Sequence, residues 1–569
     1  MMFSRIGLVT VSVLLAPAVL ATEGAVATGH PLATQAGITM LKRGGNAMDA
    51  AVAASFVLGV VEPEGSGLGG GGFAVVYDAK RQQSRTLDFR EVAPRRVRPD
   101  TYVENSEPQT QRTKEGVLAG AVPGQVRGLV LLHRTYGRLN FKQVVAPAIR
   151  LAEQGFSVSA ELQQHLERSQ TRLSRQSASA KIWYVEGRVP MAGTILKQSD
   201  LAKTLKAIAA SGGESFYTGS TSRLWVQYMK QAQGLTTAQD LKEYRPVWRD
   251  PLVGLYRDYT VVSMPPPSSG GVHLIQMLNV LGLRDLKGMA TDQRTLFMAE
   301  TMKLAYADRS RFLGDPAFVP VPVPQLTALN YARRLEATIS LQPVPSKMIE
   351  PGALLDSATR ARFKTWEVAA ESQNTSHLSA MDGQGNAIAL TQTINGSFGA
   401  GVVVPGTGVL LNNEMDDFAI APGVPNLFGL VGGAANRIEP FKRPLSSMTP
   451  TLIFKAGRPW VALGSPGGAF IITSVLQTMV NLIDLEQPLD QAIRSPRFHH
   501  QWLPDQLFVE ADLSQPLKEQ LQTQGYTLRS LRAMGSVQAV MAEPLAPFKF
   551  QAAADPRREG TGQVYIKAK

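Results

Sequence analysis

The run Asn374-Thr375-Ser376-His377 could carry nucleophilic chemistry. A threonine hydroxyl is a poor nucleophile in neutral water unless a base lies within hydrogen-bonding distance. An N-terminal threonine brings that base with it, because its α-amino group has an ordinary pKa of about 7.7–8.0 and is partly neutral near pH 7. On its own the run is a weak signal, since a threonine that follows an asparagine in a loop is usually a turn residue.

A second candidate is Gly467-Gly468 in the segment LGSPGGAFIITSVLQ, which predicts a strand, a tight turn and then a helix. The first backbone N–H groups of a helix have no partner inside the helix and point outward at its positive end. Such donors would stabilise negative charge that develops on an oxygen atom during a reaction. A turn that only caps the helix explains the two glycines equally well.

A third candidate combines charged and hydroxyl side chains around a loop. The segment LNNEMDDF contains Asp416 and Asp417, and it is followed by the loop PGVPNLFGLVGG and then by KRPLSSMTP. Arg90, in TLDFREVAP, follows a predicted strand and would supply a cation for a carboxylate. Together these residue types suggest a pocket for a small zwitterion under a lid. The alternative is that the charged residues lie on the surface.

Several other kinds of site are disfavoured. The chain has no cysteine, which excludes thiol catalysis, cysteine-ligated zinc and iron–sulfur clusters. Its histidines, including His499-His500, lack metal-ligand spacing. The run GSGLGGGGF lacks the Gly-Lys-Ser/Thr ending of a phosphate loop and precedes a strand, so no nucleotide site is expected. The net charge of +12 is spread along the chain, which favours a solvated basic surface over nucleic-acid or membrane binding.

The first 21 residues have the pattern of a secretory signal. Arg5 precedes an uncharged stretch, residues 6–20, and the stretch closes with Ala-Val-Leu-Ala at Ala21. This stretch is shorter than the roughly 20 residues that span a bilayer, and no later segment is long and apolar enough. We therefore expect a signal peptide at 1–21 and an exported mature protein without a membrane span, in the periplasm or secreted.

The remaining chain has the composition of a folded protein, with 44% hydrophobic and 18% charged residues. Apolar residues at helical spacing predict helices within 28–61, interrupted at Gly44-Gly45, and a strand from about Phe73. Residues 140–380 are mostly helical in pattern, whereas alternating β-rich runs dominate after about 370, with one helix directly after Gly467-Gly468. Strands with helices on their outer faces indicate a layered α/β fold.

Ten segments, in order along nearly the whole mature chain, resemble the signature segments of the γ-glutamyltransferase (γ-glutamyltranspeptidase, glutathione hydrolase) family. Each segment alone is weak evidence, but ten in the same order are specific. The segments are GGNAMDAAVAA, VEPEGSGLGGGGF, DFREVAP, FYTGS, NTSHLSAMD, NNEMDDF, PGVPNLFGLVGG, RPLSSMTPT, GSPGGAFIIT and PRFHHQWLPD.

The resemblance implies an N-terminal nucleophile hydrolase, a four-layer αββα sandwich built from two subunits of one autoprocessed precursor. The scissile bond would be Asn374–Thr375, which would give a large subunit of residues 22–374 and a small subunit of residues 375–569 as a heterodimer. The change of pattern near residue 370, read independently, falls at the same place.

The resemblance also implies the roles of individual residues. Thr375 would be the nucleophile, Thr393 the hydroxyl that supports it, and the Gly467 and Gly468 amides the oxyanion hole. Residues 422–433, including Phe428, would form the lid. The α-carboxylate of the γ-glutamyl group would be held by Arg90, Ser446 and Ser447, and its α-amino group by Asn395, Glu414 and Asp417. This division suits the charges, because a cation and hydroxyl donors face the anion while carboxylates and an amide oxygen face the ammonium.

The implied reaction transfers the γ-glutamyl group of glutathione or similar amides through a Thr375 ester to water or to an amino acid or peptide. It needs no metal or organic cofactor. Glu414 stands where many bacterial members have glutamine, and Ser376 where threonine is commoner; both changes are expected to matter little. Phe428 stands where tyrosine is common, which predicts a looser lid and a shifted balance between hydrolysis and transfer.

Two other functions fit parts of the pattern. A glutaryl-cephalosporin acylase of the same superfamily would have no need of Asp417, because a glutaryl group lacks the α-amino group. A non-catalytic binding protein with the same fold would have no need of the intact set Thr375, Thr393, Gly467 and Gly468. The retained residues therefore favour a γ-glutamyl substrate and an active enzyme.

Overall fold

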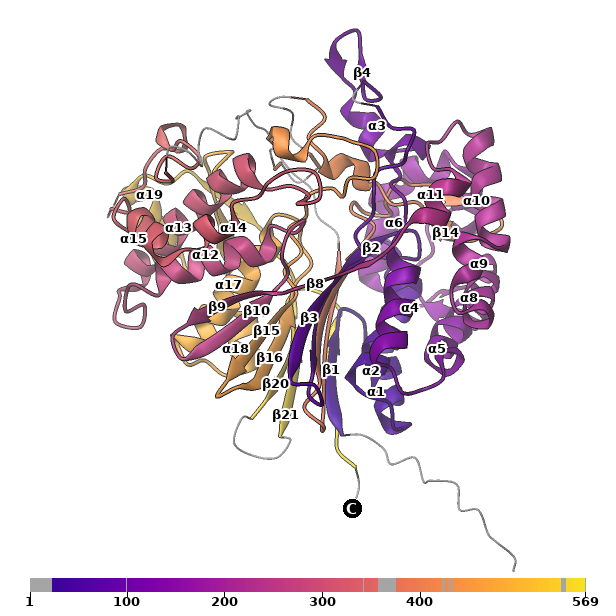
Figure 1. The fold of residues 1–569 in the computed structure, drawn as a ribbon, viewed down its shortest axis with the longest axis horizontal. Coiled ribbons are helices and arrows are strands. Elements are labelled where there is room, and N and C mark those ends of the chain that lie inside the picture. Colours follow the sequence, from indigo (N-terminus) through magenta and orange to yellow (C-terminus); the bar gives the residue numbers. More distant parts are fainter. Residues whose placement is uncertain are drawn as a thin grey trace, which may run out of the picture.

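Two antiparallel β-sheets pack face to face, and helices cover the outer face of each sheet (Figure 1). The computed structural model describes residues 23–98, 100–340, 342–356, 375–421, 424, 426–427, 429–430, 433–543 and 549–567. The architecture is the predicted four-layer αββα sandwich. The predicted signal peptide and the predicted scissile bond, with Asn374, lie outside the described residues.

Both sheets take strands from both sides of residue 375. The seven-stranded sheet has the order β22 (Thr561–Tyr565), β1 (Gly24–Thr28), β11 (Ser376–Asp382), β12 (Ala387–Thr393), β2 (Gly71–Asp78), β3 (Gln83–Asp88) and β8 (Val247–Arg249). The six-stranded sheet has the order β21 (Phe550–Ala554), β20 (Gln538–Ala542), β16 (Arg458–Gly464), β15 (Thr451–Lys455), β10 (Tyr259–Ser263) and β9 (Leu252–Tyr256). If the chain were cut before residue 375, each of the two pieces would still contribute strands to both sheets.

Each outer layer is helical (Figure 1). Beside the seven-stranded sheet lie α1 (Pro31–Lys42), α2 (Ala47–Val61), α4 (Gln125–Tyr136), α5 (Phe141–Gln154), α6 (Ala160–Ser174), α8 (Ser199–Ser211) and α10 (Ser220–Gln231). Beside the six-stranded sheet lie α12 (Gly270–Leu281), α13 (Thr291–Phe312), α15 (Leu329–Glu336), α17 (Phe470–Ile483), α18 (Leu489–Arg494) and α19 (Gln515–Gln524).

The alternation of side chains along β12 separates two parts of the core. Ile388 and Leu390 are buried in the cluster that the seven-stranded sheet shares with its helices. Ala387 and Ala389 are buried between the two sheets, beside Val75. Successive side chains of a strand point to opposite faces, so a strand in this layer must be apolar on both. Small alanines on the inner face let the sheets approach closely.

The predicted break in the first helical region is confirmed. α1 ends at Lys42 and α2 begins at Ala47, and Gly44 between them has a φ of 82°. Asn46 and Asp49 form a reciprocal capping box at the start of α2. This pair satisfies backbone N–H groups that have no partner inside the helix.

Some predicted patterns were incomplete. The stretch 140–380, expected to be mostly helical, contains the strands β8, β9 and β10, and the β-rich C-terminal part contains α18 and α19 besides the predicted helix. β9 lies at a sheet edge, where Val253 and Leu255 are exposed and Val262 of neighbouring β10 is buried. Short edge strands between helices give only a brief alternating pattern, which explains why the sequence did not reveal them.

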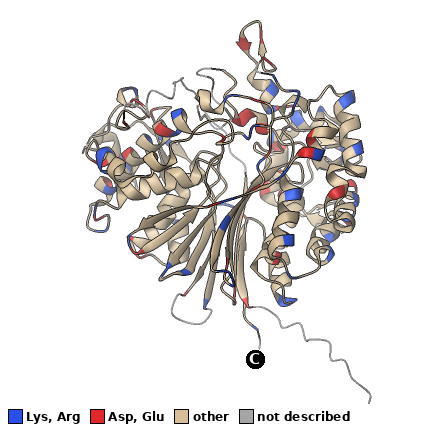
Figure 2. Ribbon diagram, viewed as in Figure 1, with Lys and Arg blue, Asp and Glu red and all other residues tan. Residues whose placement is uncertain are grey.

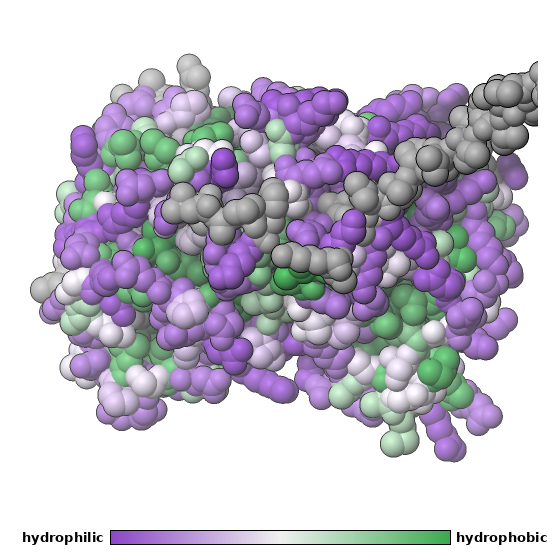
Figure 3. All heavy atoms as spheres, turned by 90° about the horizontal axis from the view of Figure 1, so that it is seen from below, coloured by the Kyte–Doolittle hydropathy of each residue, from purple (hydrophilic) through white to green (hydrophobic). Residues whose placement is uncertain are grey.

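Charged residues are scattered over both helical layers, with Lys and Arg interspersed among Asp and Glu (Figure 2). Polar side chains cover most of the lower face, and smaller apolar patches lie between them (Figure 3). Within the described ranges, no helix combines the length and the apolar character required to cross a membrane.

Candidate active site

Most of the predicted site residues line one cavity, although they come from distant parts of the chain. The residues that line it are Arg90, Arg309, Thr375, Thr393, Asn395, Asp417, Leu430, Ser446, Ser447, Met448, Gly468 and Ile471. Glu414 and Gly467, the other two predicted residues, lie beside it: Glu414 contacts Arg90, and Gly467 precedes Gly468. The structure therefore brings together the set that the sequence proposed.

Two threonine hydroxyls meet in this cavity. Thr375 lies directly before β11, and Thr393 ends the neighbouring strand β12. The Thr375 hydroxyl donates to the Thr393 hydroxyl over 3.3 Å, and the Thr393 oxygen also accepts the Asn395 N–H at 2.8 Å. Thr393 is thereby held in place, in contact with the Thr375 hydroxyl.

The Gly467-Gly468 turn joins β16 to α17. Gly467 and Gly468 have φ values of 131° and 56°, conformations that L-residues with a side chain rarely adopt. A Cβ atom on Gly467 would lie 2.9 Å from the Gly535 Cα atom. The helix begins at Phe470, so its N-terminal end is directed toward the cavity that Gly468 lines. This is the arrangement expected for an anion-stabilising turn.

Arg90, which the resemblance assigned to the substrate's α-carboxylate, is paired with the two carboxylates that it assigned to the α-amino group. Its Nη1 atom lies 2.6 Å from Glu414 Oε2, and its Nη2 atom forms an ion pair with Asp417. The guanidinium also donates to the carbonyl oxygens of Pro444 and Leu445, at 3.3 Å and 3.2 Å. The cation is therefore fixed in direct contact with the acidic residues.

Carboxyl groups outnumber guanidinium groups around Arg90, because Glu91 is a third carboxyl group, buried and 3.7 Å from the guanidinium. Burial raises the pKa of Glu91 to about 8, and it raises the pKa values of Glu414 and Asp417, while Arg90 opposes each of these shifts. A buried excess of carboxyl groups is relieved by protons or by a bound cation. This side of the cavity is thus suited to an ammonium group.

A second cation, Arg309 of α13, was missed by the sequence analysis. Its Nε atom donates to the Ser269 hydroxyl at 2.9 Å, and its Nη2 atom donates to the Ser447 hydroxyl at 3.0 Å. Burial lowers its pKa to about 10, which leaves it protonated at neutral pH. With Ser446 and Ser447 it forms a side of the cavity suited to a carboxylate.

The predicted lid, residues 422–433, is only partly described; Phe428 and residues 422, 423, 425, 431 and 432 lie outside the described residues. Asn426 Nδ2 donates to Asp417 Oδ1 at 3.0 Å, and Leu430 lines the cavity. The Leu427 N–H donates to Asp416 over 2.5 Å, so Asp416 anchors this segment and is not part of the cavity wall.

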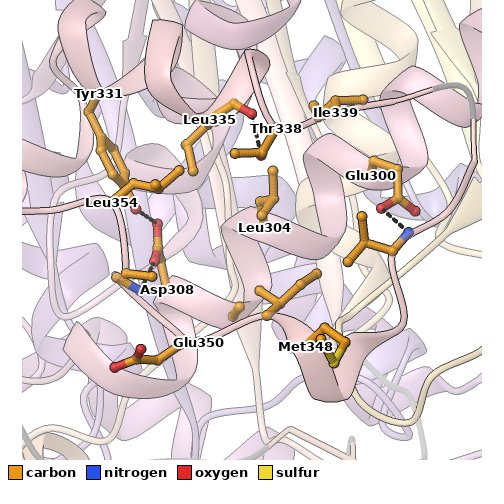
Figure 4. A pocket seen from close by; sticks show the side chains of 15 residues that line it. Glu300, Leu304, Asp308, Tyr331, Leu335, Thr338, Ile339, Met348, Glu350 and Leu354 are labelled. Atoms are coloured by element: carbon orange, nitrogen blue, oxygen red, sulfur yellow. Dashed lines mark hydrogen bonds between the residues drawn. The ribbon is translucent and has the colours of Figure 1, made fainter.

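A separate cavity of about 170 Å³ lies between α13, α15 and residues 344–354 (Figure 4). Its lining is mostly aliphatic, and Asp308 accepts hydrogen bonds from the Tyr331 hydroxyl at 2.8 Å and from the Gly352 N–H at 2.9 Å. Asp308 and Arg309 are neighbours on α13, yet Asp308 faces this cavity and Arg309 faces the one that contains Thr375. Over the described ranges, no cluster of three or more His, Asp or Glu side chains is arranged to hold a metal ion.

Comparisons with known proteins agree with this geometry. The family model of gamma-glutamyltranspeptidase matches residues 33–565. The glutathione hydrolase proenzyme of Escherichia coli (strain K12) is 43% identical over 542 residues, which cover 94% of this chain and 91% of that protein.

Two solved structures share the fold. A cephalosporin acylase from Bacillus halodurans superposes with a TM-score of 0.85 at 28% identity and covers 100% of both chains. The gamma-glutamyltranspeptidase of Helicobacter pylori superposes with a TM-score of 0.56 at 38% identity, covering 62% of this chain and 99% of that one. The family model matches nearly the whole length of this chain, and most of the expected residues line one cavity. The chain therefore belongs to the gamma-glutamyltranspeptidase family.

Proposed function

We propose that this protein is a γ-glutamyltransferase with glutathione hydrolase activity, and that Thr375 is its nucleophile. The observation that carries the proposal is the position of the Thr375 hydroxyl. It contacts Thr393 in a cavity that also contains Gly468 and two oppositely charged sides. A γ-glutamyl group carries the matching charges, an ammonium and a carboxylate on one carbon atom.

The reaction has two halves. The Thr375 oxygen attacks the γ-amide carbonyl, and its proton passes to the α-amino group that cleavage before Thr375 exposes. Negative charge develops on the carbonyl oxygen, where the N–H groups of the Gly467-Gly468 turn would stabilise it. The α-amino group then passes the proton to the leaving nitrogen, the amine departs, and a γ-glutamyl ester of Thr375 remains. Water or the amino group of an amino acid or peptide then attacks the ester and restores the hydroxyl.

The substrate's α-ammonium would lie against Asp417, Glu414 and Asn395, and its α-carboxylate against Ser446, Ser447 and the guanidinium groups of Arg90 and Arg309. Because Arg90 contacts both Glu414 and Asp417, it joins the two sides and also keeps the carboxylates in position. These roles rest on the charges and hydrogen bonds of the cavity together with the family membership.

Self-cleavage at Asn374–Thr375 would give subunits of residues 22–374 and 375–569. Their separation after cleavage is disfavoured, since β1 pairs with both β11 and β22, and β10 pairs with β15. A stable heterodimer is the expected product. Export, with removal of residues 1–21 and a final location in the periplasm or outside the cell, completes the proposal.

An acylase specific for a glutaryl group is the second candidate, because an acylase is among the structures with the same fold. The buried Glu414 and the partly buried Asp417 favour the γ-glutamyl substrate, since a glutaryl group offers no ammonium to compensate them. Hydrolysis rates of γ-glutamyl-p-nitroanilide and of the matching glutaryl anilide would separate the two. A higher kcat/KM for the glutaryl compound would overturn the proposal.

The decisive experiment joins processing and activity. Purified wild-type protein should show two bands on a denaturing gel, and N-terminal sequencing of the smaller band should begin at Thr375. The Thr375→Ala variant should remain a single folded chain without γ-glutamyl hydrolysis. Full activity in this variant, or in protein whose 374–375 bond is intact, would refute the assignment.

A further inference from the structure

The glycine-rich segment GSGLGGGGF packs against the peptide groups around Thr375 and Thr393. A Cβ atom on Gly70 would lie 2.0 Å from the Thr393 carbonyl oxygen. A Cβ atom on Gly65 would lie 3.1 Å from the Ser376 hydroxyl oxygen and 3.4 Å from the Thr375 carbonyl oxygen. Only a backbone with few side chains can approach the reactive strand ends so closely.

Glu62, the residue that follows α2, lies three positions before this glycine-rich segment, and its side chain reaches the start of β11. Its carboxyl Oε2 atom accepts a 2.5 Å hydrogen bond from the Ser376 hydroxyl. The carboxyl group is buried against Gly29, where a Cβ atom would lie 2.4 Å from Oε1. Residue 29 is thus a glycine at a position where a side chain would collide with the Glu62 carboxyl group.

The geometry of β11 connects this hydrogen bond to the nucleophile. Side chains alternate along a strand, so Ser376 faces α2 together with Leu378, while Thr375 faces the opposite side, where the cavity lies. The pairing of β11 with β12 begins at Ser376 and Gln392, so Thr375 lies just before this ladder. The orientation of the first paired residue therefore determines the direction of the Thr375 side chain.

The peptide group of Thr375 has a second contact, on the same side as Glu62. Arg558 Nη1 donates to the Thr375 carbonyl oxygen at 3.1 Å. Arg558 is also 3.7 Å from Glu161 of α6. The backbone before β11 is thus held by Arg558, from the segment that precedes β22, and Glu161 of α6 lies beside this arginine.

The charges around Glu62 act in opposite directions. Burial is the largest influence and raises its pKa to about 7; Ser376 and Arg558 lower it, and Glu161 and Glu559 raise it. Glu64, on the same loop, is also buried and has a raised pKa. A carboxylate at the C-terminal end of a helix is not stabilised by the helix dipole, so helix capping does not explain the contact between Glu62 and Ser376.

We propose that Glu62 is a positioning residue for the nucleophile: through its hydrogen bond with Ser376 it fixes the direction in which Thr375 points. The proposal rests on the proposed function, since it takes Thr375 as the nucleophile. Among the described residues, Glu62 bonds to Ser376 and does not line the cavity that contains Thr375, so it would act on the turnover step and on self-cleavage, which use the same hydroxyl. It also gives Ser376, which the sequence analysis expected to matter little, a definite role.

The test compares the variants Glu62→Gln and Ser376→Ala with their double variant, with kcat expressed per cleaved small subunit. A misplaced nucleophile predicts a fall in kcat of about 10- to 100-fold with KM changed less than about twofold. The double variant should be no slower than the slower single variant, because both remove one hydrogen bond. Ser376→Thr keeps the hydroxyl and should retain most of the wild-type kcat.

Ser379→Ala is the matched control, because Ser379 lies on the same strand and is buried, but its hydroxyl contacts His377 and the Gln538 carbonyl oxygen. Its kcat should stay within about twofold of wild type. A Glu62→Gln precursor that stays uncut but melts at the same temperature as uncut Thr375→Ala would support the proposal. If Glu62→Gln fails to fold, Ser376→Ala and Ser376→Thr decide between the outcomes.

Wild-type kcat and self-cleavage rates in both Glu62→Gln and Ser376→Ala would overturn the proposal, as would an equal loss in Ser379→Ala. A failure of the proposed function gives a different result. In that case the wild-type protein itself would not hydrolyse γ-glutamyl-p-nitroanilide, whatever residue stands at position 62.

Discussion

The Arg309 guanidinium donates a 3.0 Å hydrogen bond to the Ser447 hydroxyl, although the two residues are 138 positions apart in the chain. Arg90, the other cation of the cavity, is occupied by Glu414 and Asp417. Arg309 is therefore the cation better placed to receive a substrate carboxylate beside Ser447. We therefore expect Arg90 mainly to hold the acidic residues in position and Arg309 to make the larger contribution to binding the substrate carboxylate.

Replacing Arg309 by lysine should weaken substrate binding. The guanidinium donates to the Ser269 and Ser447 hydroxyls simultaneously through two separate nitrogen atoms. Lysine keeps the charge but has a single nitrogen and lacks this fork. We expect KM for γ-glutamyl-p-nitroanilide to rise about 10- to 100-fold, with a smaller change in kcat. Steady-state kinetics on the cleaved enzyme measure this, and Arg294→Lys on the same helix is the control. An unchanged KM would remove Arg309 from the binding site.

The charge of Asp417 should decide between γ-glutamyl and glutaryl substrates. In Asp417→Asn the side chain keeps its size, but the negative charge near the substrate's ammonium is lost. We expect kcat/KM for γ-glutamyl-p-nitroanilide to fall about 10- to 100-fold while kcat/KM for the glutaryl anilide stays level or rises. The ratio of the two values in one preparation is the measurement. Equal falls for both substrates would mean that Asp417 acts only through its ion pair with Arg90.

Local sequence pointed to the central features of the site, and the family resemblance then assigned their roles. Gly467-Gly468 between a strand and an apolar helix, and Thr375 at the change from helical to β-rich pattern, are signals that short segments carry. The structure places both at the cavity. The layered fold could be predicted for the same reason, since β12 and α17 have clear periods of two and of about 3.6 residues.

Pairings between distant residues could not be predicted from the sequence. The hydrogen bond between Ser376 and Glu62 spans 314 positions, and neither neighbourhood indicates its partner. Arg309 did leave a local signal: residues three and four positions away on both sides, Ala305, Tyr306, Phe312 and Leu313, are apolar and buried. A charged residue on the apolar face of a helix has to find a polar partner, and this rule would have identified it.

The hydroxyl of Thr393 should be more important than its methyl group. It contacts the Thr375 hydroxyl at 3.3 Å and accepts the Asn395 N–H, and valine has the same shape without either ability. Thr393→Val should lower kcat about 100-fold, whereas Thr393→Ser should stay within about tenfold of wild type. The rates are measured per cleaved subunit, so that slow maturation is not mistaken for slow turnover. Equal rates for the serine and valine variants would contradict a role for the hydroxyl.

The buried Asp308 should make stability depend on pH. Burial raises its pKa from the ordinary value of 3.8 to about 6, despite hydrogen bonds from Tyr331, Gln276 and Gly352. The native state therefore holds this proton more tightly than the unfolded state. The resulting stabilisation is complete below about pH 4 and is lost as the pH rises through about 6.

Two pKa units correspond to about 3 kcal/mol at most, so the effect is large enough for a melting experiment. In Asp308→Asn the side chain cannot titrate. Its amide nitrogen would face the donors of Gln276 and Tyr331, which lowers the stability by the same amount at every pH. The difference in melting temperature between Thr375→Ala and Thr375→Ala/Asp308→Asn should therefore be largest near pH 4 and smaller near pH 7. Using the uncut background removes any effect of subunit separation. A difference that does not vary between pH 4 and pH 7 would show that folding does not raise the pKa of Asp308.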